Sequence, residues 1–235
     1  EMDRAKNQSS VDRVLSYSEV EGRAKTQGIA EPGTVEVVHI LLREAGVTQI
    51  LVPANFPFGH ALKFQSLGYQ LYPKRDPFYE ERVVKTAEEV RYIEAAQRAT
   101  EQAVAAAHDM LRQASIEKDE LWFDGIPLTS ERVKKLINVA LMENDCVAQH
   151  TIVAGGEQAC DPHNEGSGPL PSHRSIIFDV FPRSATDRYF ADMSRTVVRG
   201  TPSPELKRLY QTVLDAQEEA ITKVKDGADG KRIHQ

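Results

Sequence analysis

The sequence predicts an α+β protein built in two parts, and three observations support this fold class. Helical and strand-like patterns alternate over the first 77 residues. Two long amphipathic helical patterns follow between residues 86 and 143. From residue 149 the hydrophobic period changes from helical to strand-like. We therefore expect a first domain over residues 1–77 and a second over residues 78–235.

Composition excludes several classes of protein. The chain has 235 residues, of which 40% are hydrophobic, and no apolar run approaches the roughly 20 residues of a membrane helix. The net charge of −6 argues against a general nucleic-acid binder. The polar start lacks the apolar core of a signal peptide, and we expect Cys146 and Cys160 to be reduced thiols. These features predict a cytoplasmic protein that engages neither nucleic acid nor membrane.

The first part is predicted to be a small α/β layer. Val35, Val38, Leu41 and Leu42 recur at helical spacing, and Gly46 follows as a C-terminal stop. A strand, a helix and a strand are then expected over residues 49–53, 58–67 and 69–72. The proline- and charge-containing segment 73–82 is expected to be a linker.

The second part begins with a long helix. Thr86 and Glu89 match a capping box, and an apolar stripe continues to Leu111. The final helix has Ser203 as its cap and Pro204 at its first position. The other elements expected here are a helix over 129–143, strands over 149–154, 175–181 and 189–198, and a hairpin-like connection over 182–188.

Two aspartates lie in the last pair of predicted strands. Asp179 follows an apolar run and Asp192 comes 13 residues later. If the connection is a hairpin, both carboxylates can face each other across the ladder. Such a pair is unfavourable unless a positive group lies between them. A divalent metal, or a pair of metals, is one answer. An ion pair with Arg195 is the competing explanation. Arg195 lies three residues after Asp192, so on a regular strand its side chain should point to the opposite face.

His163 is the third candidate. It lies in Cys160-Asp161-Pro162-His163-Asn164-Glu165-Gly166, after the strand predicted over 149–154. A histidine fixed by a preceding proline, with a glycine beyond it, suits a residue that faces a site. An ordinary loop histidine is the alternative.

Taken together, these segments resemble the pita-bread metallopeptidases, which include Xaa-Pro aminopeptidases, Xaa-Pro dipeptidases, creatinase and methionine aminopeptidases. The resemblance is carried by Thr151–Ala159, Pro162-His163, the Asp179 strand and Tyr189-Phe190-Ala191-Asp192-Met193-Ser194-Arg195-Thr196. Phe78–Glu89 is similar to the junction between that family's two domains. The resemblance implies the first half of a pita-bread catalytic domain, preceded by a partial creatinase-like α/β domain.

The family's site can be carried over residue by residue. Its two metal-binding aspartates match Asp179 and Asp192, and its substrate-binding histidine matches His163, which we expect to be catalytic. The resemblance implies two divalent ions (manganese, cobalt or zinc), hydrolysis of a peptide with proline at its second position, and a homodimer. Aminopeptidase and dipeptidase remain equally open.

The sequence also departs from the family. The connection between the aspartates is slightly longer than usual, and Arg188 replaces a typical glycine. The family completes its site with a further histidine and two glutamates, all beyond the position of Gln235. We therefore expect a piece of a longer enzyme that, by itself, binds metal weakly and catalyses nothing. The alternatives are a catalytically dead binding module of the same fold and a creatinase-like hydrolase.

Overall fold

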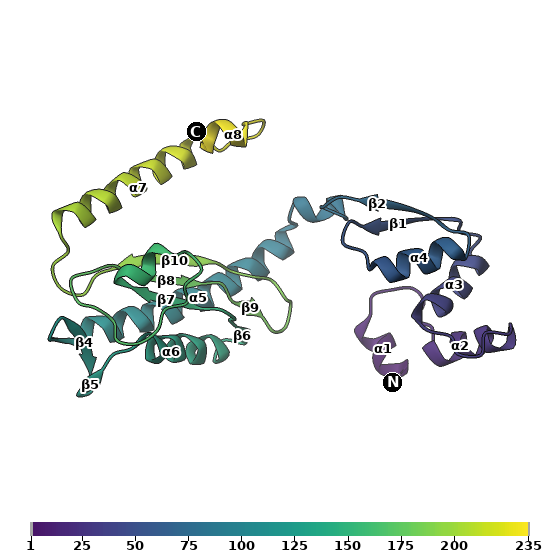
Figure 1. Ribbon diagram of the computed structural model, residues 1–235, viewed down its shortest axis with the longest axis horizontal. Coiled ribbons are helices and arrows are strands. Elements are labelled where there is room, and N and C mark those ends of the chain that lie inside the picture. The colour runs from purple at the N-terminus through teal and green to yellow at the C-terminus, as the bar shows by residue number, and fades with distance from the viewer. Residues whose placement is uncertain (1, 235) are drawn as a thin grey trace. The chain divides into compact units, whose positions relative to one another are not determined.

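The computed structural model describes residues 2–234, which form two compact units (Figure 1). The first unit extends to Val84 and the second begins at Lys85. The sequence places the domain boundary after Pro77, and that boundary stays a prediction. The residues between the two positions include a short 3-10 helix, η1 (Glu80–Val83), whose Glu80 pairs with Lys74 at 3.1 Å.

The first unit is a helical layer on a two-stranded parallel sheet. Its elements are α1 (Met2–Gln8), α2 (Tyr17–Thr26), α3 (Thr34–Glu44), β1 (Gln49–Pro53), α4 (Phe58–Ser66) and β2 (Gln70–Lys74). Strands β1 and β2 pair in parallel, with Ile50 opposite Leu71, and α4 connects them. The predicted helix–strand–helix–strand order is therefore present, whereas α2 was not anticipated.

Over residues 85–234, the second unit contains three helices of ten residues or more and three small sheets. Its helices are α5 (Ala87–Gln113), α6 (Ser130–Met142), η2 (Gly156–Cys160), α7 (Pro204–Lys223) and α8 (Gly230–His234). Its strands are β3 (Ser115–Glu117), β4 (Glu120–Phe123), β5 (Ile126–Pro127), β6 (Cys146–Val147), β7 (Ile152–Gly155), β8 (Ile176–Val180), β9 (Arg183–Ser184) and β10 (Met193–Val197).

The principal sheet has the order β10-β8-β7, with both pairs antiparallel. Ile176, Phe178 and Val180 alternate along β8 and are fully buried, in one core with apolar residues of α5 and α6. Figure 1 shows α7 on the other side of this sheet. The sheet thus has one face in the core and one face that carries polar side chains, as alternation along a strand requires.

The connection between β8 and β10 is a hairpin, as the sequence predicts, because the two strands pair antiparallel and Ser184 N donates to Tyr189 O at 2.9 Å beyond their ends. Strand β10 begins at Met193 rather than Tyr189, and the residues before it include β9. Strand β9 pairs with β6, and Arg183 also bridges Phe190. The pairing of β9 with β6 is additional to the hairpin, and local sequence patterns do not reveal it because the two segments are distant in the chain.

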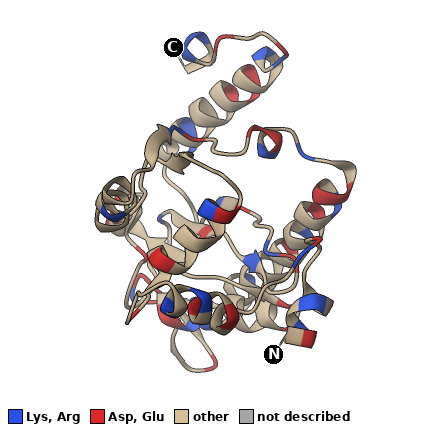
Figure 2. Ribbon diagram, turned by 90° about the vertical axis from the view of Figure 1, so that its right-hand side faces the viewer, with Lys and Arg blue, Asp and Glu red and all other residues tan. Residues whose placement is uncertain are grey.

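Charge and cysteine placement agree with an ordinary globular chain. Lys and Arg alternate with Asp and Glu along the helices (Figure 2). None of the helices in residues 2–234 combines the length and the apolar composition that crossing a membrane requires. Cys146 is buried, Cys160 is exposed, and both are free.

The start of α5 is held by a capping box that also reaches the β9–β10 connection. Thr86 Oγ1 accepts a hydrogen bond from Glu89 N at 3.2 Å, and Glu89 Oε2 accepts one from Thr86 N at 2.7 Å. Tyr189 Oη donates to Glu89 Oε1 at 2.7 Å. These hydrogen bonds, those to Thr86 first, lower the pKa of Glu89 from its ordinary 4.5 to about 2.

We expect Glu89→Gln to lower the free energy of unfolding near neutral pH and to lose this effect in acid. Because the folded pKa is depressed, the stabilisation is complete above the ordinary value of 4.5 and disappears as pH falls toward about 2. Urea unfolding of wild type and variant at several pH values measures the difference. Glu94→Gln, an exposed change on the same helix, should show no such pH dependence, and a constant difference for Glu89→Gln would contradict the assignment.

Candidate functional site

Asp179 lies on the polar face of the principal sheet. It occupies β8 between Phe178 and Val180, whose side chains point into the core. Its partner across β10 is Ser194, and Ser194 Oγ donates to Asp179 Oδ1 at 2.8 Å. The strand therefore presents the carboxylate away from the core, and the serine hydroxyl orients it.

Asp192 reaches the same face from the residue before β10. It precedes Ser194, the residue opposite Asp179, by two positions, and it therefore lies diagonally from Asp179. The sequence had suggested that the two aspartates face each other directly. The pKa of Asp192 is raised, first by partial removal of its carboxyl from water and then by the charge of Asp179 and a hydrogen bond to it. The residue as a whole remains exposed. The two carboxyl groups thus meet on one face, where they disfavour double ionisation.

The structure does not support Arg195 as the counter-ion of this pair. Arg195 lies opposite Phe178 in the ladder, on the other face of the sheet from Asp179. Its Nη1 donates to the backbone oxygen of Ser194 at 2.8 Å. The guanidinium of Arg195 is therefore not the positive group that would neutralise the two carboxylates.

The donor set partly fits a divalent cation. Two adjacent carboxylates, one with a raised pKa, offer the oxygen ligands that hard cations prefer. Across residues 2–234, however, no three His, Cys, Asp or Glu side chains come together as a metal-holding group. Since such a cation takes about six ligands, these two carboxylates alone do not complete a metal site.

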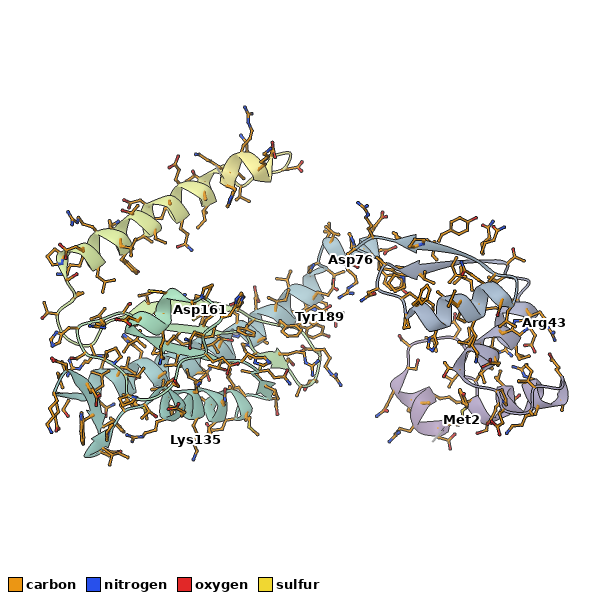
Figure 3. The ribbon with its side chains drawn as sticks, viewed as in Figure 1. Met2, Arg43, Asp76, Lys135, Asp161 and Tyr189 are labelled. Carbon is orange, nitrogen blue, oxygen red and sulfur yellow. The ribbon has the colours of Figure 1, made fainter. Side chains whose placement is uncertain are left out.

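His163 is placed on an exposed loop that follows η2. Its backbone N donates to Asp161 Oδ1 at 2.9 Å, and Asn164 N donates to Asp161 O at 3.1 Å, which makes a tight turn. Asp161 is labelled in Figure 3. In the described part of the chain, the imidazole of His163 does not form a metal-holding group with Asp179 and Asp192. The role of His163 therefore stays a prediction.

The far side of this loop approaches β7 very closely. Val153 N donates to Glu165 O at 3.1 Å, and Gly166 is buried with a φ of +78°. A Cβ atom added to Gly166 would overlap the carbonyl oxygen of Val153. Glycine is required at this position both by its left-handed backbone and by the space available.

We expect Gly166→Ala to destabilise the second unit by about 3 kcal/mol or more, from backbone strain of about 1–2 kcal/mol plus the cost of the overlap. Gly168→Ala is the matched control, because Gly168 has a φ of +71° and nothing within 4 Å of an added Cβ. It should cost only the strain, about 1–2 kcal/mol. Chemical unfolding measures both; equal losses would contradict the close approach.

A groove of about 900 Å³ lies between α7 and the polar face of the sheet. Ser194, which binds Asp179, lines it together with Cys160 and Ile177. The α7 side is mostly apolar and includes Leu206, Tyr210 and Val213. The carboxylate face thus borders a space that is large enough for a small peptide.

Sequence reasoning missed two features of this site. It did not identify Ser194 as the partner of Asp179. Ser194 lies two residues after Asp192, and residues two apart on a strand point to the same face, so this spacing was an available signal. It also missed the residues of α6 that hold the His163 loop. No sequence signal marks those contacts, because residues about 30 positions apart make them.

The chain resembles a known peptidase family over most of the second unit. Residues 91–235 match the sequence profile of metallopeptidase family M24. The Xaa-Pro dipeptidase of Pyrococcus horikoshii is 24% identical over 191 residues, which is 80% of this chain and 51% of that protein. The Xaa-Pro dipeptidase of Pyrococcus furiosus is 27% identical over 153 residues, covering 65% of this chain and 40% of that protein.

Solved structures show the same fold. A prolidase from Pyrococcus furiosus has a TM-score of 0.70 at 21% identity, covering 94% of this chain and 57% of that one. An X-Pro aminopeptidase from Thermotoga maritima has a TM-score of 0.70 at 21% identity, covering 87% and 56%. The chain adopts the pita-bread fold of these proteins, and it spans about half the length of the relatives it matches.

Proposed function

Because the chain belongs to metallopeptidase family M24, we propose that the protein is a metal-dependent peptidase that hydrolyses the peptide bond before proline. The observation that carries the proposal is the meeting of Asp179 and Asp192 on one sheet face without Arg195 between them. The names of the Pyrococcus relatives support the preference for Xaa-Pro peptides.

Each candidate residue has a distinct role in this proposal. Asp179, oriented by Ser194, and Asp192 would hold divalent ions through their carboxylate oxygens. Bound divalent ions lower the pKa of water and polarise a scissile carbonyl. His163 would contact the substrate beside them. Manganese, cobalt and zinc all suit oxygen ligands of this type. The proposal also includes a cytoplasmic location and a homodimer.

The described residues supply only two of the acidic ligands. Since a hard cation takes about six, we expect residues 2–234 alone to bind metal weakly and to hydrolyse little. The complete activity belongs to a protein in which further His or Glu ligands reach this face.

A second candidate is a pita-bread module that binds peptides without cleaving them. It has the same fold, and the paired aspartates favour the peptidase over it. Metal-dependent turnover distinguishes the two.

We expect Asp179→Asn and Asp192→Asn each to reduce hydrolysis of an Xaa-Pro peptide by more than about 100-fold, because each removes a charged ligand. The measurement uses the protein with its complete set of metal ligands, stripped with a chelator and restored with Mn²⁺ or Co²⁺, with one Xaa-Pro dipeptide and one Xaa-Pro tripeptide as substrates. Cleavage of the dipeptide alone would assign a dipeptidase.

Asp119→Asn is the matched control, since Asp119 is exposed in the β3–β4 turn, and it should retain activity. A wild-type protein that carries the complete set of metal ligands, binds the tripeptide and cleaves neither substrate with any metal would support the binding module. Full activity in Asp179→Asn or Asp192→Asn would refute the site assignment.

A further inference from the structure

The loop that carries His163 is fastened to α6 by side chains that the proposed chemistry does not use. Lys134 Nζ donates to the backbone oxygens of Gly166 at 2.9 Å and Glu165 at 3.2 Å. These acceptors lie two and three residues from His163. The ammonium group thus binds the loop itself rather than a carboxylate on its own helix.

Two residues in the first turn of α6 continue this attachment. Ser130 N donates to Gly168 O at 2.9 Å, and Gly168 N donates to Glu131 Oε1 at 3.0 Å. The pKa of Glu131 is lowered, first by hydrogen bonds from its own backbone and from Gly168. The carboxylate therefore stays ionised at neutral pH and its bond to the loop is charge-assisted.

The segment before His163 joins the other end of the loop. Ser167 N donates to Gln158 Oε1 at 3.0 Å, and Gln158 Nε2 donates to Ser167 O at 3.1 Å. This reciprocal pair closes the loop between η2 and residue 167. The exposed turn at residues 161–164 is then the part whose position follows the anchors on either side.

We propose that Lys134 is a positioning residue, which sets the place of His163 relative to the sheet face of Asp179 and Asp192. The proposal rests on the proposed function of that face. Lys134 does so through the backbone of Glu165 and Gly166, and it contacts neither substrate nor metal. A charged donor suits this task because a single ammonium group can bind two carbonyl oxygens.

The test is Lys134→Met, which keeps the aliphatic stem and removes both hydrogen bonds. Lys135→Met is the matched control: Lys135 is exposed on the same helix and extends away from the sheet in Figure 3. Hydrogen exchange of peptides covering residues 161–168 should accelerate roughly tenfold in Lys134→Met, because charge-assisted bonds to the loop are lost. Exchange in β8 and the melting temperature should change little, and Lys135→Met should match wild type.

Kinetics of the metal-loaded protein separate positioning from a purely structural role. In Lys134→Met we expect kcat for an Xaa-Pro peptide to fall roughly tenfold, while KM and Mn²⁺ affinity stay near wild type. Lys134→Arg, which can donate to both oxygens, should restore most of kcat.

Unchanged loop exchange in Lys134→Met would overturn the proposal, as would a loosened loop with an unchanged kcat. Absence of metal-dependent hydrolysis in a wild-type protein that carries the complete set of metal ligands would instead refute the proposed function. The role of Lys134 in the reaction would then fall as well, while the exchange measurement would still decide whether Lys134 anchors the loop.

Discussion

Strand β8 can occupy only one register, and the position of every candidate ligand depends on this constraint. It is paired on both sides, with β7 and with β10. Ile176, Phe178 and Val180 have no exposed surface. A shift of one residue would bring these side chains to the polar face and put Asp179 into the core. Burial of three large apolar groups therefore determines where the carboxylate points.

The same register explains why the carboxylates meet diagonally. Ser194 takes the position opposite Asp179 and donates to it, and Asp192 follows the strand face from just outside the ladder. The diagonal arrangement keeps one oxygen of Asp179 bonded to Ser194, and partial burial together with the charge of Asp179 raises the pKa of Asp192.

Local sequence patterns were sufficient to predict the helix caps and the strands that carry this site. They were insufficient to predict which distant segments contact those elements. Thr86 and Ser203 accept the predicted capping bonds because those contacts span three residues. The apolar run before Asp179 likewise identified β8. The pairing of β9 with β6 and the reach of Lys134 to Gly166 join distant segments. The β3–β5 strands were unassigned because they are short, with turns at Lys118 and Asp119 that adopt positive φ.

The His163 loop also has a structural task, which links the site to the stability of the sheet. Strand β7 is at the edge of the sheet, and an uncovered edge exposes backbone donors and acceptors. Val153 N donates to Glu165 O, and Val153 O accepts from Ser130 Oγ at 2.6 Å, so the loop and α6 cover this edge together. A loop held only by its ends could be displaced without breaking any contact with the sheet. Because displacement of this loop would expose the edge of β7, the chain uses one set of contacts both to protect the sheet and to keep the residues around His163 in place.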